Sequence, residues 1–458
     1  IQLSYQFNDH LKLATLLGTD FSNKDEDRFF SGLNGSGRFN GGDIGRRILR
    51  TRDTRNWNWN ATLTFDKSFK KGHNFDAILG IETRGEKSER SFIRGDNFAD
   101  FTSPQPIRTA EEIDERYDSA EQYGRSGFTQ LNYNFNKKYF LLVNFRVDQS
   151  SAFGRDNDTA LNGGLGTSWV ASNEKFLSDT DFIDFLRLRA SYGTTGNSRI
   201  GSYRALGLYQ FNFNGYNGID YVNPVGTAPN PNLGWERNNK FNLGIDFNFK
   251  SNYKLTLEVF RDLIQEAIVS RPAIPESGYS NIQINGASMV NSGIELSFNA
   301  DWIKNKNFSW SSNFNAATLR NEVTALSGIG SDFSAAGRAR AQQVGFPTYT
   351  IWGFESLGID PATGRELFNV AGNTYDAQYV RENFTNADWT PIGDSQPDVY
   401  GGMRNNFKYK NFNLGVIMSY SFGGEQIINR SIIDNYNVFF NRNLNLNAFY
   451  ESWREPGD

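Results

Sequence analysis

The stretch NWNWNATLTFD, residues 56–66, alternates apolar and polar residues without a break. Successive side chains of a β-strand point to opposite faces of the sheet, so this pattern predicts a strand with two unlike faces. One face receives Trp57, Trp59, Ala61, Leu63 and Phe65. The other receives Asn58, Asn60, Thr62 and Thr64. The same alternation recurs along the whole chain, often with aromatic strand ends, and this predicts a barrel with lipid outside and water inside.

The composition fits membrane-spanning strands better than membrane-spanning helices. Mean hydropathy is −0.57 and 38% of the residues are apolar. No continuous apolar stretch reaches the roughly 18 residues of a membrane helix, and the longest clusters, such as residues 139–143, have the length of a strand. A closed sheet needs only alternate apolar residues, because its backbone hydrogen bonds form between strands. The 15% of aromatic residues predicts girdles at the membrane surfaces. The predicted fold class is therefore all-β, a transmembrane antiparallel β-barrel.

Charge and residue usage argue against several classes of function. A net charge of −4 and a pI near 5.6 disfavour nucleic-acid binding. The chain has no cysteine and two histidines, His10 and His73, both in predicted turns. We find no Ser-His-Asp set, no phosphate-binding P-loop and no zinc-ligand spacing. The sequence therefore predicts neither an enzyme nor a protein with a metal or cofactor.

The connections between the predicted strands fall into two length classes. Short turns rich in Asn, Lys and Gly are predicted near residues 8–10, 67–73, 136–138, 250–252, 304–307 and 408–411. Long loops are predicted at approximately 22–56, 87–121, 195–238, 264–290, 320–397 and 424–458. Short turns at one rim and long loops at the other are typical of outer-membrane barrels, with the loops extracellular. A large soluble β-sandwich or propeller is the alternative, and it explains neither this asymmetry nor the absence of a fixed repeat period.

Both ends of the sequence indicate a partial barrel. Ile1 opens directly into a strand pattern, without a signal peptide before it, and the last residues, YESWREPGD at 450–458, form a polar segment. We therefore expect residues 1–458 to be a fragment of a longer protein that lacks pieces at both ends.

An ordered set of motifs resembles the SusC/RagA-type TonB-dependent transporters of Bacteroidota outer membranes. The motifs are RASYGTTGN (189–197), NPNLGWE (230–236), MVNSGIELSF (289–298), VGFPTYTIWGFESLGIDPATG (344–364), PIGDSQPDVYGG (391–402) and SYSFGG (419–424). Each string alone is weak, but their order and spacing match the family over roughly residues 120–458, and the earlier part matches more loosely. The resemblance implies a 22-stranded barrel in the outer membrane, an N-terminal plug and a TonB box. It also implies import of glycan or peptide nutrients with a SusD-like lipoprotein, energised by the TonB complex.

The chain departs from the family pattern in three places. It contains no plug-like segment, no TonB box and no final aromatic-ended strand. The plug and the contact with the TonB complex would therefore belong to a part of the protein outside this sequence, and energised gating cannot be derived from these residues.

Aromatic residues in the predicted loops are the candidate substrate-binding residues, because they offer stacking faces and hydrogen bonds. They are Tyr216, Tyr221, Trp235, Tyr349 and Trp352. The competing interpretation is that loop aromatics pack against one another, and that Trp235 lies at the membrane–water boundary, where an amphipathic ring is favoured.

Charged residues in the same regions have ordinary structural interpretations. Arg187 and Arg189 are predicted to face the lumen, where pairing with a carboxylate or with water competes with binding of an acidic substrate. Asp360, Asp394 and Asp398 are too loosely spaced for a calcium site, so turn capping is the better interpretation. The acidic residues of 111–115 are expected in a short solvated helix within a loop.

Two functional classes remain open at this point. The first is active import through the barrel. The second is a barrel that anchors a surface-binding or assembly platform without active transport, and a passive porin is a weaker third. A plug domain in the preceding sequence would favour import.

Overall fold

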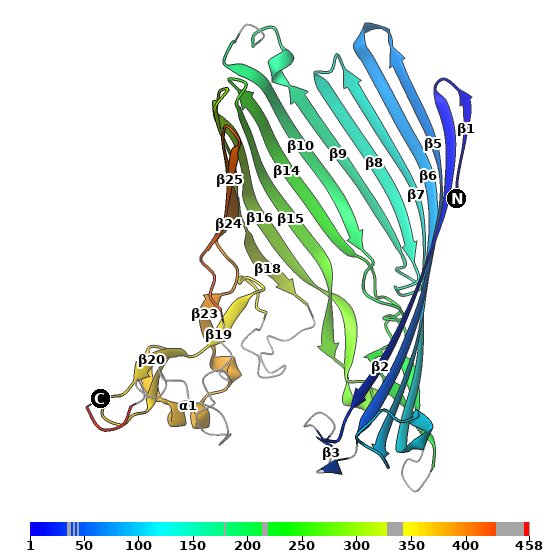
Figure 1. The fold of residues 1–458 in the computed structure, drawn as a ribbon, viewed down its shortest axis with the longest axis vertical. Helices are drawn as coiled ribbons and strands as arrows, with labels where there is room; N and C mark the ends of the chain where they lie inside the picture. The colour runs from blue at the N-terminus through cyan, green and yellow to red at the C-terminus, as the bar shows by residue number, and fades with distance from the viewer. Residues whose placement is uncertain are drawn as a thin grey trace. The chain divides into compact units, whose positions relative to one another are not determined.

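The computed structural model describes residues 1–33, 38–39, 42–43, 45–177, 180–212, 219–327, 342–426 and 453–457 (Figure 1). The chain divides into two compact units. Unit 1 comprises residues 1–167, 192–237 and 268–285, and unit 2 comprises residues 168–191, 238–267 and 286–458. Across the described ranges, no helix has the length and apolar character that a membrane crossing requires.

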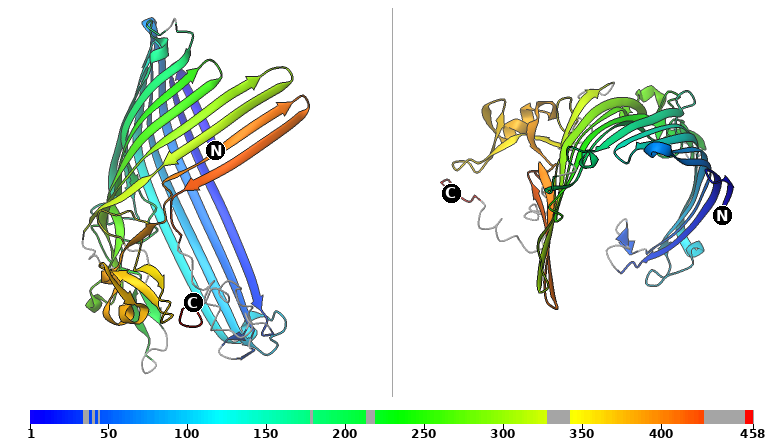
Figure 2. Two further views of the ribbon diagram at one scale, coloured as in Figure 1. Left: turned by 90° about the vertical axis from the view of Figure 1, so that its left-hand side faces the viewer. Right: turned by 90° about the horizontal axis from the view of Figure 1, so that it is seen from above.

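Unit 1 is built on long antiparallel strands that pair in chain order. The strands are β1 (Gln2–Asn8), β2 (Leu11–Phe30), β5 (Arg46–Phe69), β6 (His73–Phe98), β7 (Ala110–Phe135) and β8 (Tyr139–Ser150). They run side by side in Figure 1, coloured blue to cyan, and Figure 2 shows the same neighbours from two further sides. Small elements lie at the connections: β3 (Arg38–Phe39), β4 (Gly42–Asp43), η1 (Lys70–Gly72) and η2 (Ile107–Thr109). Unit 1 also contains β11 (Leu208–Asn212) paired with β12 (Tyr221–Val225), β13 (Thr227–Ala228) and η5 (Pro275–Ser277).

Several strands contribute residues to both units. They are β9 (Thr159–Val170), β10 (Ile183–Asn197), β14 (Glu236–Phe249), β15 (Tyr253–Pro272) and β16 (Asn281–Lys304).

Unit 2 combines shorter barrel-type strands with a small mixed module. Its strands β17 (Phe308–Thr318), β24 (Val399–Tyr409) and β25 (Phe412–Phe422) pair in that order, and β18 (Arg320–Leu326) pairs with β16. The module contains β19 (Thr350–Gly353), β20 (Glu355–Ile359), β21 (Glu366–Val370), β22 (Asn373–Asp376), α1 (Ala377–Asn383), η6 (Asn386–Asp388) and β23 (Thr390–Asp394). The 3₁₀-helix η3 (Ala171–Asn173) also belongs to this unit.

The register of the long strands is unbroken, which keeps each face uniform. β5 pairs with β6 from Arg46 opposite Asp96 to Phe69 opposite His73 without a bulge. β2 pairs with β5 from Leu11 opposite Phe65 to Phe30 opposite Arg46, again without a shift. A one-residue slip would move every side chain to the other face, so this constant register maintains the division into an apolar and a polar face.

The apolar face points away from any protein core. Trp57, Leu243 and Val416, three residues of the predicted lipid-facing set, are 36%, 45% and 37% exposed. Leu79 and Ile81 on β6 are 60% and 52% exposed. Large apolar side chains exposed in continuous stripes mark a surface that contacts something other than water, as the predicted barrel exterior requires.

The predicted tight turns are confirmed. The chain reverses between Phe135 and Tyr139, between Phe249 and Tyr253 and between Tyr409 and Phe412. Positive backbone φ angles occur at Lys71, Asn136, Lys137, Lys250, Ser251 and Lys410. These are the turn positions at which the sequence predicted this conformation.

The predicted long loops are shorter in the structure, because strands extend into them. The connection predicted at 22–56 narrows to 31–45, that at 87–121 narrows to 99–109, and that at 264–290 narrows to 273–280. The predicted helix at residues 111–115 is wrong, since these residues belong to β7. Four of these five residues are acidic and only Ile113 is apolar, so the alternation signal disappears while the strand pairing continues. The loop predicted at 195–238 contains β11–β13, and that at 320–397 contains β18–β23 and α1. Of the loop at 424–458, residues 424–426 and 453–457 are described.

Candidate functional site

The apolar face of unit 1 carries a band without charged side chains. The candidate site lies where this band ends along the strands. On β5 the band runs from Trp57 to Phe65, between Arg55 and Lys67, which point to the same face. On β6 it continues past Gly85 and ends at Lys87. A strand crosses a bilayer in about 9–11 residues, and the band has this length. Because β5 has 24 residues and β6 has 26, a large part of each strand lies beyond it.

A cavity of about 490 Å³ opens on the polar face of unit 1, where this band ends. Its polar lining comes from β2, β5, β6 and β7 and from the segment after β10: Asp20, Asn56, Asn58, Arg84, Glu86, Gln122, Ser198 and Arg199. These strand residues occupy alternate positions, so the period of two directs them to one face. Gly18 lies at the wall, where an added Cβ would meet no atom within 4 Å. The cavity is therefore open, and residues of the opposite face, Thr19, Trp57, Gly85 and Tyr123, line it together with these polar groups.

The segment after β10 is hydrogen-bonded across the polar face. Arg84 Nη2 donates to Ser198 Oγ at 3.3 Å, and Gln122 Nε2 donates to the Ser198 carbonyl at 3.3 Å. The Glu121 backbone N–H donates to Tyr203 Oη at 3.0 Å. These bonds join residues far apart in the sequence, so the cavity exists only in the folded sheet.

The cavity presents both donors and acceptors, with charges of both signs. Arg84 and Arg199 balance Asp20 and Glu86 along its lining. Asn56 Oδ1 is buried and accepts no hydrogen bond from the described residues. Guanidinium groups donate, carboxylates accept and amides do both, so the lining suits hydroxyl or amide groups of a polar ligand.

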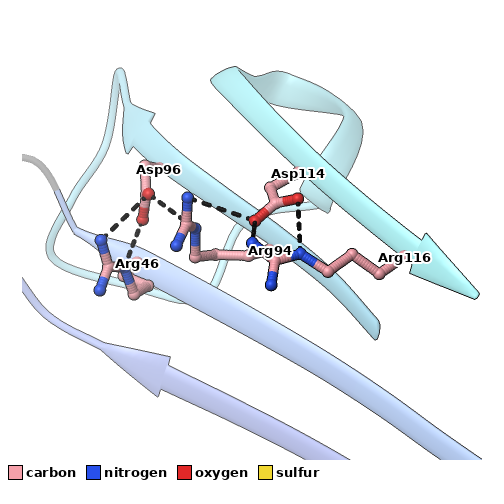
Figure 3. Close-up of polar contacts among 5 residues, drawn as sticks. All are labelled: Arg46, Arg94, Asp96, Asp114 and Arg116. Carbon is pink, nitrogen blue, oxygen red and sulfur yellow. Dashed lines mark hydrogen bonds and ion pairs between the residues drawn. The ribbon is translucent and has the colours of Figure 1, made fainter. Parts of the chain in front are cut away.

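An ion-pair network crosses the polar face near the far ends of the same strands (Figure 3). Arg46 binds Asp96 with two contacts, Nε–Oδ1 at 2.5 Å and Nη2–Oδ2 at 3.1 Å. Arg94 contacts Asp96 at 3.1 Å and Asp114 at 3.5 Å, and Arg116 contacts Asp114 at 2.9 Å. Asp96 is 3% exposed. A buried carboxylate must be paired, and the partners of Asp96 are Arg46 of β5 and Arg94 of β6. With Asp114 and Arg116 of β7, the network connects the ends of three strands.

The connection between β6 and β7 is organised around one carboxylate, that of Asp100. It accepts hydrogen bonds from the backbone N–H and hydroxyl of Thr102, from the Ser103 hydroxyl and from the Gln105 amide. The Thr102 and Ser103 hydroxyls lower the pKa of Asp100 to about 2. The connection that follows β2 is hydrogen-bonded to this one, because the Gly32 N–H donates to the Phe101 carbonyl at 3.0 Å.

In unit 2, Arg187 and Arg189 pair with carboxylates. Arg187 Nη2 lies 2.8 Å from Asp246, and Arg189 contacts both Asp246, at 3.2 Å, and Glu258. Asn242 donates to Glu258 at 3.1 Å. Of the two predicted roles, this arrangement is that of a structural ion-pair network across β10, β14 and β15.

Two of the three predicted aspartate caps, Asp360 and Asp394, have the geometry of turn caps. Asp360 accepts from the Ala362 N–H at 3.0 Å and from the Thr363 hydroxyl, and Asp394 accepts from the Gln396 N–H at 3.0 Å. In the part of the chain that the structure describes, no cluster of three or more metal-ligating side chains occurs.

The candidate aromatic residues divide between the two units. In unit 1, Tyr221 lies in β12 and is 49% exposed. Trp235 stacks near Phe153, with ring centroids 4.6 Å apart, and its indole N–H donates to the Asp158 carbonyl at 2.8 Å. Tyr216 lies outside the described residues.

The other two candidates lie in unit 2, where Tyr349 directly precedes β19 and Trp352 lies within it. Tyr349 is 51% exposed, whereas Trp352 is 2% exposed and packs edge-on against Phe346 at 4.9 Å. Tyr221 and Tyr349 thus present free ring surface, and Trp235 and Trp352 have protein contacts that fix their rings.

The sequence did not single out the residues that line the cavity. Asn58 was visible only as the polar side of an alternating strand, and Arg84, Gln122 and Ser198 carried no motif. Alternation could have placed Asn58 and Arg84 on one face, but Gln122 lies 76 residues from its partner Ser198. Only the folded chain brings these groups together.

Comparisons with known proteins agree on one family. The family model described as "TonB dependent receptor-like, beta-barrel" matches residues 1–450. TonB-dependent receptor P3 of Formosa agariphila is 28% identical over 462 residues, covering 94% of this chain and 44% of its own length. TonB-dependent receptor SusC of Bacteroides thetaiotaomicron is 26% identical over 446 residues, covering 90% of this chain and 42% of its own. The chain thus spans less than half the length of these curated relatives.

A solved structure shows the same fold. The structure titled "Structure of the RagAB peptide transporter" aligns with a TM-score of 0.80 at 24% identity, covering 92% of this chain and 47% of the other.

Proposed function

Because this chain belongs to the TonB-dependent receptor-like β-barrel family, with relatives of SusC/RagA type, we propose that it is the barrel of an active outer-membrane importer. The cargo is a glycan or peptide nutrient, and a SusD-like surface lipoprotein acts with the barrel to capture it. The TonB complex supplies the energy through a part of the protein outside this sequence. The long connections face the extracellular side.

The polar-face cavity is the observation that carries this proposal furthest. It lies beside the end of the apolar band, on the face that a barrel turns toward its lumen. Its donors and acceptors match the hydroxyls of a sugar or the amides of a peptide. An anchoring barrel without transport has no need of a polar cavity on that face.

The five aromatic candidates extend the proposed cargo path. Tyr221 and Tyr349 have exposed rings that can stack on a sugar ring or a peptide side chain. Trp235 and Trp352 would support the surrounding surface as well as contact cargo, and Tyr216 belongs to the same segment as Tyr221. We propose no catalytic step for any of these residues.

Uptake by cells that carry the full-length protein tests the proposal. Cells are given a mixture of labelled oligosaccharides and peptides, and internal label is compared with and without a protonophore. We expect uptake that depends on the protein and stops when the proton gradient collapses. Label that stays on the surface, with or without the gradient, would instead support the anchoring barrel.

Purification of the full-length protein from its native membrane tests the partner. A surface lipoprotein should remain bound in mild detergent at a fixed ratio. A barrel that purifies alone under every mild condition would contradict the two-component importer.

A further inference from the structure

A second cavity on the polar face of unit 1 has more cations than carboxylates in its lining. It has a volume of about 330 Å³ and lies between the apolar-band level and the network of Figure 3, across β2, β5, β6 and β7. Its positively charged lining residues are Lys24, Arg50, Arg52 and Arg90, and its negatively charged ones are Glu26 and Asp118. The four positively charged side chains are thus gathered around one cavity.

The strand register places three of the cations in one row. Lys24 of β2 lies directly opposite Arg52 of β5, and Arg52 lies directly opposite Arg90 of β6. Asp118 of β7 closes the row beside Arg90. Side chains directly opposite on one face have Cβ atoms about 5 Å apart, so the three cationic side chains start from neighbouring positions on one face.

These cations lack the partners that the neighbouring arginines have. Among the described residues, no hydrogen bond or ion pair engages the side chains of Lys24, Arg52 or Arg90. Asp118 lies directly opposite Arg90, and the other carboxylate of the cavity, Glu26, is already shared by Arg28 and by Arg50 at 3.5 Å. By contrast, Arg46, Arg94 and Arg116 in Figure 3 each contact a carboxylate. Like charges directly opposite on a sheet repel each other, so this row favours the arrival of an anion.

We propose that the row of Lys24, Arg52 and Arg90 binds a carboxylate group of the cargo. A guanidinium presents two parallel N–H groups to a carboxylate, and two adjacent guanidinium groups can hold both oxygens. The negative charge of Asp118 directs the anion toward the Lys24 and Arg52 side of the row. The exposure of Arg52 and Arg90 leaves both heads open to the cavity. This inference rests on the proposed import function and adds the charge of the cargo to it.

Binding measurements on the full-length protein in detergent test the carboxylate site at low salt. The probes form two pairs: a hexuronate tetrasaccharide with a neutral hexose tetrasaccharide, and a tetraglutamate peptide with a tetraglutamine peptide. At least one carboxylated probe should bind about tenfold or more tightly than its neutral counterpart, as expected when charge-assisted pairs form. The pair that shows the preference identifies whether the carboxylate belongs to a glycan or to a peptide.

The decisive variant is the double substitution Arg52→Gln/Arg90→Gln. It should remove the preference for the carboxylated probe, whereas Arg55→Gln, on the opposite face of the same strand, should retain it. Equal binding of both members of each pair, or a preference that survives in the double variant, would overturn the proposal. Calorimetric melting without ligand checks the fold. Relief of repulsion should leave the melting temperature of the double variant equal to or above that of the parent protein, and a lower value would instead assign the arginines to holding the wall together.

Binding and uptake give separate outcomes. The binding assay needs no proton gradient, so a failed carboxylate site does not imply failed import. If the parent protein binds the carboxylated probe but imports nothing, the import function is wrong and the site remains.

Discussion

Asp100 shows how a single residue organises a connection between two long strands. Four groups donate to its carboxylate, and they belong to three of the next five residues, Thr102, Ser103 and Gln105. The depressed pKa, about 2, means that these bonds favour the ionised form. The folded connection therefore depends on a charge that sits fully at the surface.

The pH dependence of this connection follows from the sign of that shift. A carboxylate with a lowered pKa contributes its full stabilisation above the ordinary value of 3.8, and loses it as pH falls through about 2. We expect amide hydrogen exchange in residues 99–106, corrected for the intrinsic rate, to accelerate between about pH 4 and pH 2. Mass spectrometry of pulse-labelled protein measures this.

An Asp100→Ala variant provides the comparison. At pH 7 it should exchange several-fold faster in this segment than the parent protein, with unchanged exchange in β6. At pH 2 the two proteins should converge. A segment protected equally in both proteins at pH 7 would show that Asp100 does not organise it.

Two adjacent residues of β8 separate the apolar face from the polar face. Val143 is 36% exposed on the apolar face, and Asn144 faces the other way. Val143→Arg should lower the free energy of unfolding in lipid by about 2–4 kcal/mol, because arginine near the bilayer midplane is costly. Asn144→Arg should cost far less. Urea unfolding of protein in lipid vesicles measures both, and equal losses would mean that the two faces meet the same environment.

At the scale of elements, the turns carry most of the information that the sequence offers. Asn136 and Lys137 have φ angles of 52° and 55°, so the β7–β8 hairpin turns through two left-handed residues. The Lys138 N–H donates to the Phe135 carbonyl at 2.9 Å across these two residues, and a turn with two left-handed central residues matches the twist of the strands. Lysine in this conformation is strained, while glycine is not.

Substitution of this turn tests that strain. Lys137→Gly should raise the free energy of unfolding by about 0.5–1 kcal/mol. Lys138→Gly is the control, because Lys138 is not among the positive-φ residues, and the added chain freedom should lower stability by a similar amount. Urea titration at fixed lipid ratio measures both changes. A Lys137→Gly protein less stable than its parent would contradict the turn geometry.

Strand interiors were predictable from alternation, but strand ends were not. Residues 57–65 and 139–147 alternate because one face is apolar, and both lie in strands. Beyond the apolar band both faces carry mostly polar and charged residues. The alternation therefore fades, and residues 22–30 and 111–121 resemble a loop or a helix in sequence although backbone pairing continues. The candidate site was harder to predict from the sequence than the strands, because Ser198 lies beside Gln122 and Arg84 only in the folded chain. The row of Lys24, Arg52 and Arg90 likewise depends on register, which one strand alone does not contain.

At the scale of the whole molecule, the exposed apolar stripes dictate how the protein must be handled. Leucine, isoleucine, phenylalanine and tryptophan side chains remain exposed on strands of both units. A surface of this kind needs lipid or detergent to cover it.

We expect the full-length protein to stay in the membrane fraction after washing with alkaline carbonate and to require detergent for release. Analytical ultracentrifugation should then give a single detergent-bound species, and dilution below the critical micelle concentration should cause aggregation. A monodisperse species in detergent-free buffer would contradict the lipid-facing surface. Refolding of that material into vesicles, with recovery of β-structure, serves as the control for denaturation.

The unbroken pairing of β2, β5 and β6 also limits how such a chain can change length over evolutionary time. A single-codon deletion within β5 would exchange the faces of every side chain on one side of the deletion, placing asparagines and threonines in hydrocarbon and tryptophans in the pore. Deletions of two codons preserve parity and shift only the pairing. Viable lineages should therefore accumulate gaps in the connections at 31–45 and 99–109, and gaps within the strands should come in even numbers.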